Sequence, residues 1–137
     1  MIVVSPFLRA KQTAQPLTDK FPDVPLETWD VQEFTFLGPN SYKSSSMEEL
    51  KNLGKEYFER NDSNLIIEEG GESFNKMMNR VDNMLDRLFY IDKSKFVIVF
   101  THGRFMRAVL MKINNMPQSV QNLLTMKKID NIEIVEL

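Results

Sequence analysis

Short apolar runs and helix-spaced apolar positions alternate along the chain. Met1–Val4 is a β-branched run of strand length, and Phe96–Phe100 is a second run that is apolar on both faces. Ile132–Leu137 is expected to form a last short strand. Because strand and helix signals alternate, the sequence predicts an α/β fold of layered helices and a mainly parallel sheet.

Most of the expected helices have a recognisable start. Ser5-Pro6 offers an N-cap and a first helical residue, and Phe21-Pro22 would end that helix. Ser46 and Glu49 match a capping box, and Gly70-Gly71 precedes a third helix. A fourth helix follows the second apolar run. The expected buried faces of the last three helices are Leu50, Leu53 and Tyr57; Phe74, Met77, Val81, Leu85 and Leu88; and Met106, Val109, Leu110 and Ile113.

The stretch from Pro22 to Ser45 shows no regular pattern. It contains prolines, a glycine and one compact apolar island, WDVQEFTFL, at residues 29–37. A loop of this length inside a compact domain is usually functional or disordered. The aromatic residues of the island favour an ordered flap.

Composition narrows the class of protein. The 137 residues suffice for one domain, expected over residues 1–137, and 17 basic against 19 acidic residues give a net charge of −2. This balance argues against a nucleic-acid or membrane-surface partner. The chain has no cysteine, no signal-peptide pattern and no apolar run near the roughly 20 residues that span a bilayer. A cytoplasmic location is therefore expected.

Two segments share one design in which a buried strand is followed by a short turn and a helix start. They are IVVSPFLRA and VIVFTHGRF. Ligands bind at the carboxyl ends of strands in such sheets, where helix N-termini attract anions. Arg9 lies in the first turn of one helix, and His102, the only histidine, begins the other beside Gly103, which would let the backbone approach closely. We expect Arg9 and His102 to converge on one anion, and a cationic His102 beside Arg9 would hold a phosphate strongly.

Structural roles compete with these assignments. A single histidine at the end of a strand is more often structural than catalytic, and an arginine in a first helical turn is usually solvated. Glu33 is a solvated carboxylate unless the fold brings it inward. Glu72 lies near a helix start, where a carboxylate contributes about 0.3–1 kcal/mol without any catalysis.

Four segments taken together resemble the histidine phosphatase superfamily, in its phosphoglycerate-mutase-like branch. SPFLRAKQTA resembles a Ser-Pro-x-x-Arg-Ala-x-Gln-Thr-Ala motif, and VQEFTFL resembles the segment that carries the acidic proton donor. GGESF, followed by a helical Arg80-Val81, resembles a Gly-Glu-Ser segment. VIVFTHGRFMRAVL resembles the second, His-Gly motif. The four matches stand in family order.

The resemblance implies phosphomonoester hydrolysis or phosphoryl transfer through a phosphohistidine, without metal or cofactor. It makes Arg9 a phosphate ligand and His102 the second histidine, which binds phosphate and stabilises charge in the transition state. Glu33 matches the acid that protonates the leaving oxygen. Ser5, Glu72 and Gly103 are expected around the phosphate, and the substrate is phosphate or a phosphorylated small molecule.

One motif of the family has no match. The family opens with a strand that ends in Arg-His-Gly and carries the nucleophile, whereas His102 matches the second motif. A missing N-terminal strand and helix are therefore expected. Three interpretations stay open: a truncated enzyme, inactive as given; a non-catalytic phosphate-binding or interaction module; and an unrelated α/β anion binder.

The missing strand has a consequence for assembly. In the related fold it lies between the strands that Met1–Val4 and Phe96–Phe100 match. Unpaired buried backbone groups cost about 1–3 kcal/mol each, a large part of a net stability of about 5–15 kcal/mol. A homodimer that covers the gap is expected, with strand exchange or direct pairing of the two strands as alternatives.

Overall fold

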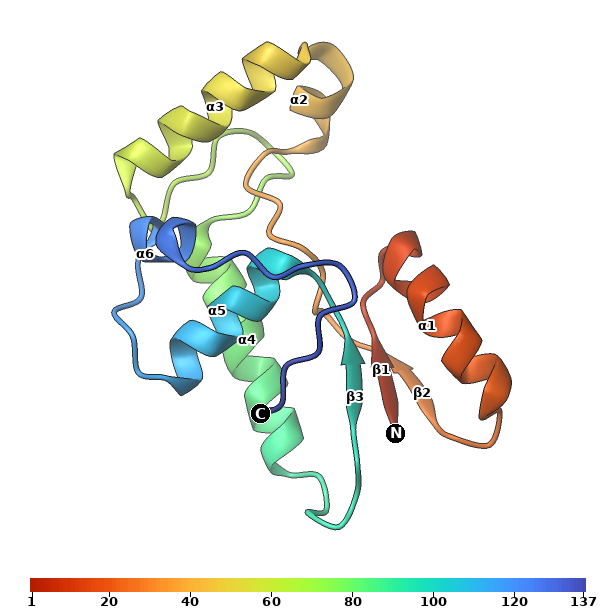
Figure 1. The fold of residues 1–137 in the computed structure, drawn as a ribbon. Coiled ribbons are helices and arrows are strands. Elements are labelled where there is room, and N and C mark those ends of the chain that lie inside the picture. The colour runs from red at the N-terminus through yellow and green to blue at the C-terminus, as the bar shows by residue number, and fades with distance from the viewer.

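The computed structural model describes residues 1–137 and contains a three-stranded parallel sheet. The strands are β1 (Ile2–Val4), β2 (Leu26–Thr28) and β3 (Ile98–Phe100), in the order β2-β1-β3 (Figure 1). β1 is the central strand and is fully buried, because it has a neighbour on each edge and helices on both faces. The α/β fold class with a parallel sheet is confirmed.

The chain has six helices. They are α1 (Leu8–Lys20), α2 (Pro39–Ser44), α3 (Met47–Arg60), α4 (Phe74–Phe89), α5 (Gly103–Ile113) and α6 (Val120–Thr125). α1 lies on one side of the sheet and contacts β1 and β3, whereas α4 and α5 pack together on the other side (Figure 1). None of the helices is both long and apolar enough to cross a bilayer.

The start of α3 agrees with the sequence, and the start of α1 does not. Ser46 and Glu49 form the capping box, each side chain bonding the other residue's backbone N–H. The expectation that Ser5 caps α1 is wrong, because the helix begins at Leu8 and the hydroxyl of Ser5 accepts a hydrogen bond from the N–H of Phe7 at 3.3 Å. Ser5 is thereby held in the turn between β1 and α1.

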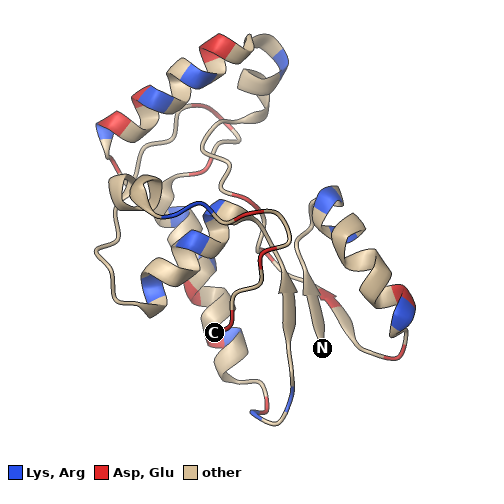
Figure 2. Ribbon diagram, in the orientation of Figure 1, with Lys and Arg blue, Asp and Glu red and all other residues tan.

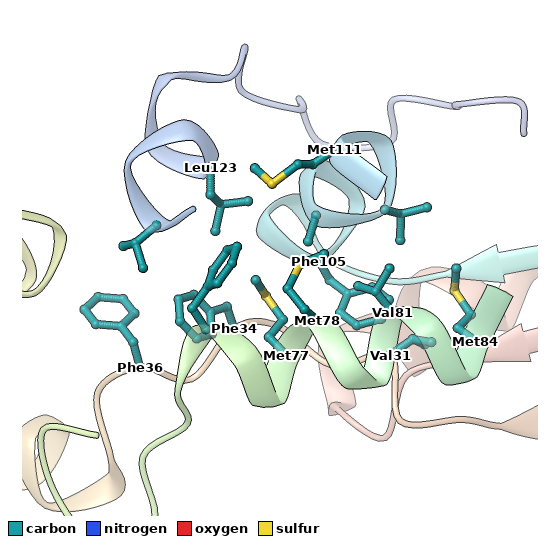
Figure 3. Close-up of a cluster of buried hydrophobic side chains, with 14 of the residues drawn as sticks. Val31, Phe34, Phe36, Met77, Met78, Val81, Met84, Phe105, Met111 and Leu123 are labelled. Carbon is teal, nitrogen blue, oxygen red and sulfur yellow. The ribbon is translucent and has the colours of Figure 1, made fainter. Parts of the chain in front are cut away.

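The main core lies between α4, α5, α6 and the segment at residues 29–37. The predicted stripe of α4 is confirmed, since Phe74, Met77 and Val81 are buried and its remaining members pack against them. The apolar island of residues 29–37, expected as an ordered flap, packs into this core. Its buried residues are Trp29, Val31, Phe34, Phe36 and Leu37, several of which Figure 3 shows facing the methionines of α4.

The predicted buried face of α5 is partly wrong. Val109 is buried as expected, but Ile113 is 40% exposed. The side chains that are fully buried instead include Phe105 and Met111. The reason is that α5 packs against both α4 and α6, so its contact surface is wider than a single stripe and turned toward α6.

The expected C-terminal strand does not form. Residues 132–137 lie outside any strand, and the side chains of Ile132 and Ile134 are each 88% exposed. The sheet ends at β3, and this segment pairs with neither edge of it. An alternation of apolar and polar residues without a strand partner therefore gave a false strand signal.

The two strands that were expected to flank a gap pair directly with each other. β1 and β3 are parallel, with Ile2 opposite Ile98 and Val4 opposite Phe100. β3 is consequently an edge strand and only half-buried, not a central strand as its apolar pattern predicted. The direct pairing removes the gap on which the expected homodimer rested, and the homodimer itself stays an untested prediction.

Phe105 tests how much the packing between α4 and α5 contributes. Its side chain is fully buried in the main core, so Phe105→Ala is expected to lower the free energy of unfolding by about 3–5 kcal/mol. Phe89→Ala is the matched control, because Phe89 is 68% exposed and should lose well under 1 kcal/mol. Urea unfolding measures both. Equal losses in the two variants would contradict the described core.

Candidate functional site

The parallel register of β1 and β3 brings two helix starts to one edge of the sheet. Val4 stands opposite Phe100, and the N–H of Ser5 donates to the carbonyl of Phe100 at 2.9 Å. The turns that lead into α1 and α5 therefore lie side by side. Lys and Arg residues occur in the first turns of both helices at this edge (Figure 2).

The side chains of Arg9, His102 and Ser5 form a continuous chain of hydrogen bonds at this edge. Arg9 Nε donates to His102 Nδ1 at 3.1 Å, and His102 Nε2 lies 2.8 Å from Ser5 Oγ. A guanidinium has only donors, so Nδ1 must be the acceptor and the ring proton is on Nε2, directed at Ser5. The structure thus brings together Arg9 and His102, as the sequence predicts.

The imidazole of His102 is largely removed from water. His102 is 8% exposed, and the ring of Phe7 packs against it with the ring centroids 5.3 Å apart. Burial first, and then the nearby charges of Arg9 and Arg80, lower the pKa of His102 to about 4. Without a bound anion the neutral ring is therefore favoured at neutral pH, where Arg9 carries the positive charge, and the cationic His102 expected beside an anion stays a prediction.

Glu33 lies at the N-terminus of α5 rather than in open solvent. Its Oε1 accepts hydrogen bonds from the N–H groups of Phe34 and Arg104, at 2.9 and 3.2 Å. Its Oε2 makes no hydrogen bond. The fold therefore brings this carboxylate to the helix that begins beside His102, where the helix dipole favours a negative charge.

Glu72 forms a buried ion pair with Arg80. Arg80 donates from Nε and Nη2 to the two carboxylate oxygens, at 2.7 Å each, and from Nη1 to the carbonyls of Asp30 and Gln32. Glu72 is 5% exposed. With both oxygens bonded to Arg80, Glu72 secures the segment that carries Glu33, and its expected place beside a phosphate stays a prediction.

No protein atom crowds Gly103. A Cβ atom added at Gly103 would meet the carbonyl oxygen of Ile129 at 3.6 Å, which is ordinary contact. The expectation that Gly103 lets the backbone approach an anion closely stays a prediction. No group of three His, Cys, Asp or Glu side chains that could hold a metal ion is present.

Arg80 is a site residue that sequence reasoning undervalued. It stands three residues after Met77 and four before Met84, both buried, so it lies on the inner face of α4. A cation on a buried helix face requires a carboxylate partner, and Glu72 was the nearest one before the helix. Arg80 on the buried face of α4 and Glu72 just before that helix were therefore the sequence signal for the ion pair.

A comparison with protein families places the chain in one of them. The family model of the histidine phosphatase superfamily (branch 1) matches residues 1–137, so the chain belongs to that superfamily. This excludes the interpretation as an unrelated anion binder. A comparison with curated proteins found no match.

Solved structures share the fold. A mycobacterial glucosyl-3-phosphoglycerate phosphatase with inorganic phosphate superposes with a TM-score of 0.70 at 20% identity, covering 96% of this chain and 65% of its own. The alpha-ribazole phosphatase from Shigella flexneri superposes with a TM-score of 0.69 at 19% identity, and the match covers 95% of this chain and 62% of that one. A protein described as mycobacterial hydrolase 1 superposes with a TM-score of 0.68 at 19% identity, and the match covers 96% of this chain and 63% of that one. The chain thus spans less than two thirds of the length of these structures.

Because His102 is the only histidine, its ring can be titrated without ambiguity by NMR. The midpoint is expected well below 6.5, near 4. Arg9→Met should move it upward, since a nearby cation that opposes protonation is removed. Lys11→Met, which removes a neighbouring exposed charge from the same helix, should have little effect. A wild-type midpoint at 6.5 or above would contradict the described burial of the ring.

The same group predicts a pH dependence of stability. The pKa of His102 is lower in the folded state than its unperturbed value of 6.5, so the unfolded state takes up the proton first. Stability is therefore lost as the pH falls from about 6.5 to about 4. His102→Gln should lose less stability over this interval than the wild type, and urea unfolding at several pH values measures the difference. Parallel profiles for the two proteins would be the contrary result.

Proposed function

We propose that this chain binds the phosphoryl group of a phosphomonoester between Arg9 and His102. The observation that carries the proposal is their hydrogen bond at the shared carboxyl end of β1 and β3, in a member of the histidine phosphatase superfamily. The inherited chemistry is hydrolysis or transfer of a phosphoryl group through a phosphohistidine. A solved relative of the same fold that holds inorganic phosphate supports a phosphorylated small molecule as the substrate.

Anion binding at this site requires a rearrangement of Arg9. In the empty site, Nε of Arg9 donates to the imidazole of His102. Because Arg9 is exposed, its guanidinium can turn outward and present two N–H donors to phosphate oxygens. Nδ1 of His102 then loses its donor. A nearby phosphate favours the protonated ring, and the imidazolium becomes a second cationic donor to the anion. Binding is thus coupled to the uptake of a proton.

Glu33 is proposed as the proton donor to the leaving group. When a phosphoryl group is transferred, the P–O bond to the alcohol breaks and the alkoxide oxygen needs a proton. Oε1 of Glu33 is held by two backbone N–H groups, which fixes the carboxyl at the start of α5. Oε2 has no partner and is the atom that would carry the proton.

We further propose that residues 1–137 alone bind phosphate without turnover. The family chemistry requires a nucleophilic histidine in addition to the second one, and the 137 residues contain only His102. A non-catalytic phosphate-binding module is the alternative. An open reading frame upstream of Met1 that encodes a strand ending in Arg-His-Gly would support the enzyme, and an in-frame stop there would support the module. The single domain over residues 1–137 and the cytoplasmic location stay predictions.

Calorimetry with inorganic phosphate and an assay with 4-nitrophenyl phosphate test these proposals together. Phosphate should bind, and Arg9→Met should weaken its binding about tenfold or more, because a charge-assisted hydrogen bond is lost. Lys11→Met is the matched control and should keep the wild-type affinity. No hydrolysis is expected. Hydrolysis that disappears in His102→Ala would overturn the proposed inactivity, and equal phosphate affinity in wild type and Arg9→Met would overturn the site.

A further inference from the structure

Phe7 occupies the N-cap position of α1, where its side chain cannot cap the helix. Its backbone is extended, with φ −71° and ψ 135°, and no side chain caps α1. Ser, Thr, Asp or Asn at this position stabilises a helix start relative to an apolar residue. The chain thus lacks a cap at the helix start that carries Arg9, and a residue that breaks a local rule in this way points to another role for its side chain.

The ring of Phe7 contacts both side chains of the proposed anion site. Its centroid lies 5.3 Å from that of the His102 imidazole, and the guanidinium carbon of Arg9 lies 4.9 Å from the centre of the ring. A cation at this distance over an aromatic face is attracted to it. The N–H of Phe7 also donates to Ser5 Oγ, which lies 2.8 Å from Nε2 of His102. One hydroxyl therefore fixes both the imidazole and the residue that covers it.

Phe7 covers the imidazole without contributing a charge to it. Burial is the largest cause of the low pKa of His102, ahead of the nearby positive charges. Four charged side chains lie near the imidazole or at the helix start beside it, and they are Arg9, Arg80, Arg104 and Glu33. Replacement of the ring of Phe7 leaves all four in place, so its effect on the titration of His102 reports the exposure of the imidazole to water.

We infer that Phe7 is a positioning residue of the anion site, which holds the guanidinium of Arg9 beside His102 and keeps the imidazole dry, so that an anion binds only together with a proton. This inference rests on the proposed phosphate site and adds the residue that makes its binding depend on pH. A covered imidazole stays neutral until an anion arrives to balance the charge of its proton. The affinity for an anion consequently rises as the pH falls, until the free protein is itself protonated.

Sulfate binding at several pH values, measured by calorimetry on the 137-residue chain, tests the inference. Sulfate keeps the same charge between about pH 5 and pH 7.5, so a proton taken up on binding goes to the protein. From about pH 6 to about pH 5 the wild-type affinity should rise about fivefold or more, because the free imidazole of His102 stays neutral down to about pH 4.

Phe7→Ser removes the cover and supplies the missing cap, so α1 should stay folded. Its free imidazole should take up the proton nearer pH 6.5, and the sulfate affinity should then rise only about threefold or less over the same interval. Phe7→Asn, which also offers a cap, should behave in the same way. Phe7→Leu keeps an apolar cover and should restore most of the wild-type rise.

Phe21→Ser is the matched control. It removes an aromatic ring that lies 5.6 Å from a cation, Lys20, at the opposite end of α1, and it should keep the wild-type pH profile. A wild-type profile in Phe7→Ser and Phe7→Asn, or the same flat profile in Phe7→Leu as in these two, would overturn the role of Phe7 and leave the anion site standing. Failure of the wild type to bind sulfate at any of these pH values would instead overturn the proposed phosphate site, and the inference with it.

Discussion

The parallel pairing of β1 with β3 is the constraint on which the site depends. It places Val4 opposite Phe100, and the hydrogen bond from Ser5 to the carbonyl of Phe100 continues this ladder one residue past the end of β1. Because both strands end at the same edge, the turns that follow them meet there. Ser5 and Arg9 follow β1, and His102 follows β3. A shift of one residue in this register would turn the alternate side chains to the opposite face of the sheet and separate the pair.

The charge balance at this edge follows from burial. His102 is packed against Phe7 and bonded by a guanidinium, so the neutral ring is favoured, while Arg9 remains exposed and charged. Without a ligand, Arg9 and His102 satisfy one another. An anion competes for both partners. Its binding therefore depends on protonation of the His102 ring and on whether the exposed side chain of Arg9 can turn toward the anion. The buried ion pair of Glu72 with Arg80 holds the segment of Glu33, and the charge of Arg80 adds to that of Arg9 in lowering the pKa of His102.

The sequence predicted elements well where one face of an element is buried against one neighbour. The stripe of α4 and the capping box of α3 are such cases. It failed on α5, which packs against two helices, and on β2, whose residues Leu26–Thr28 are all exposed and show no strand pattern. For the site, the repeated strand-turn-helix design predicted that Arg9 and His102 meet. The neutral state of the ring was not predictable, because it depends on the packing of Phe7 and on which nitrogen Arg9 bonds.

The central claim is that Arg9 and His102 form one anion site, and that the two side chains hydrogen-bond to each other when no anion is bound. A crystal structure of the 137-residue chain grown with inorganic phosphate tests it most directly. The account predicts a phosphate with oxygens about 3 Å from both the Arg9 guanidinium and a ring nitrogen of His102, and no remaining hydrogen bond from Arg9 Nε to His102 Nδ1. A phosphate bound elsewhere while that hydrogen bond persists would contradict the account.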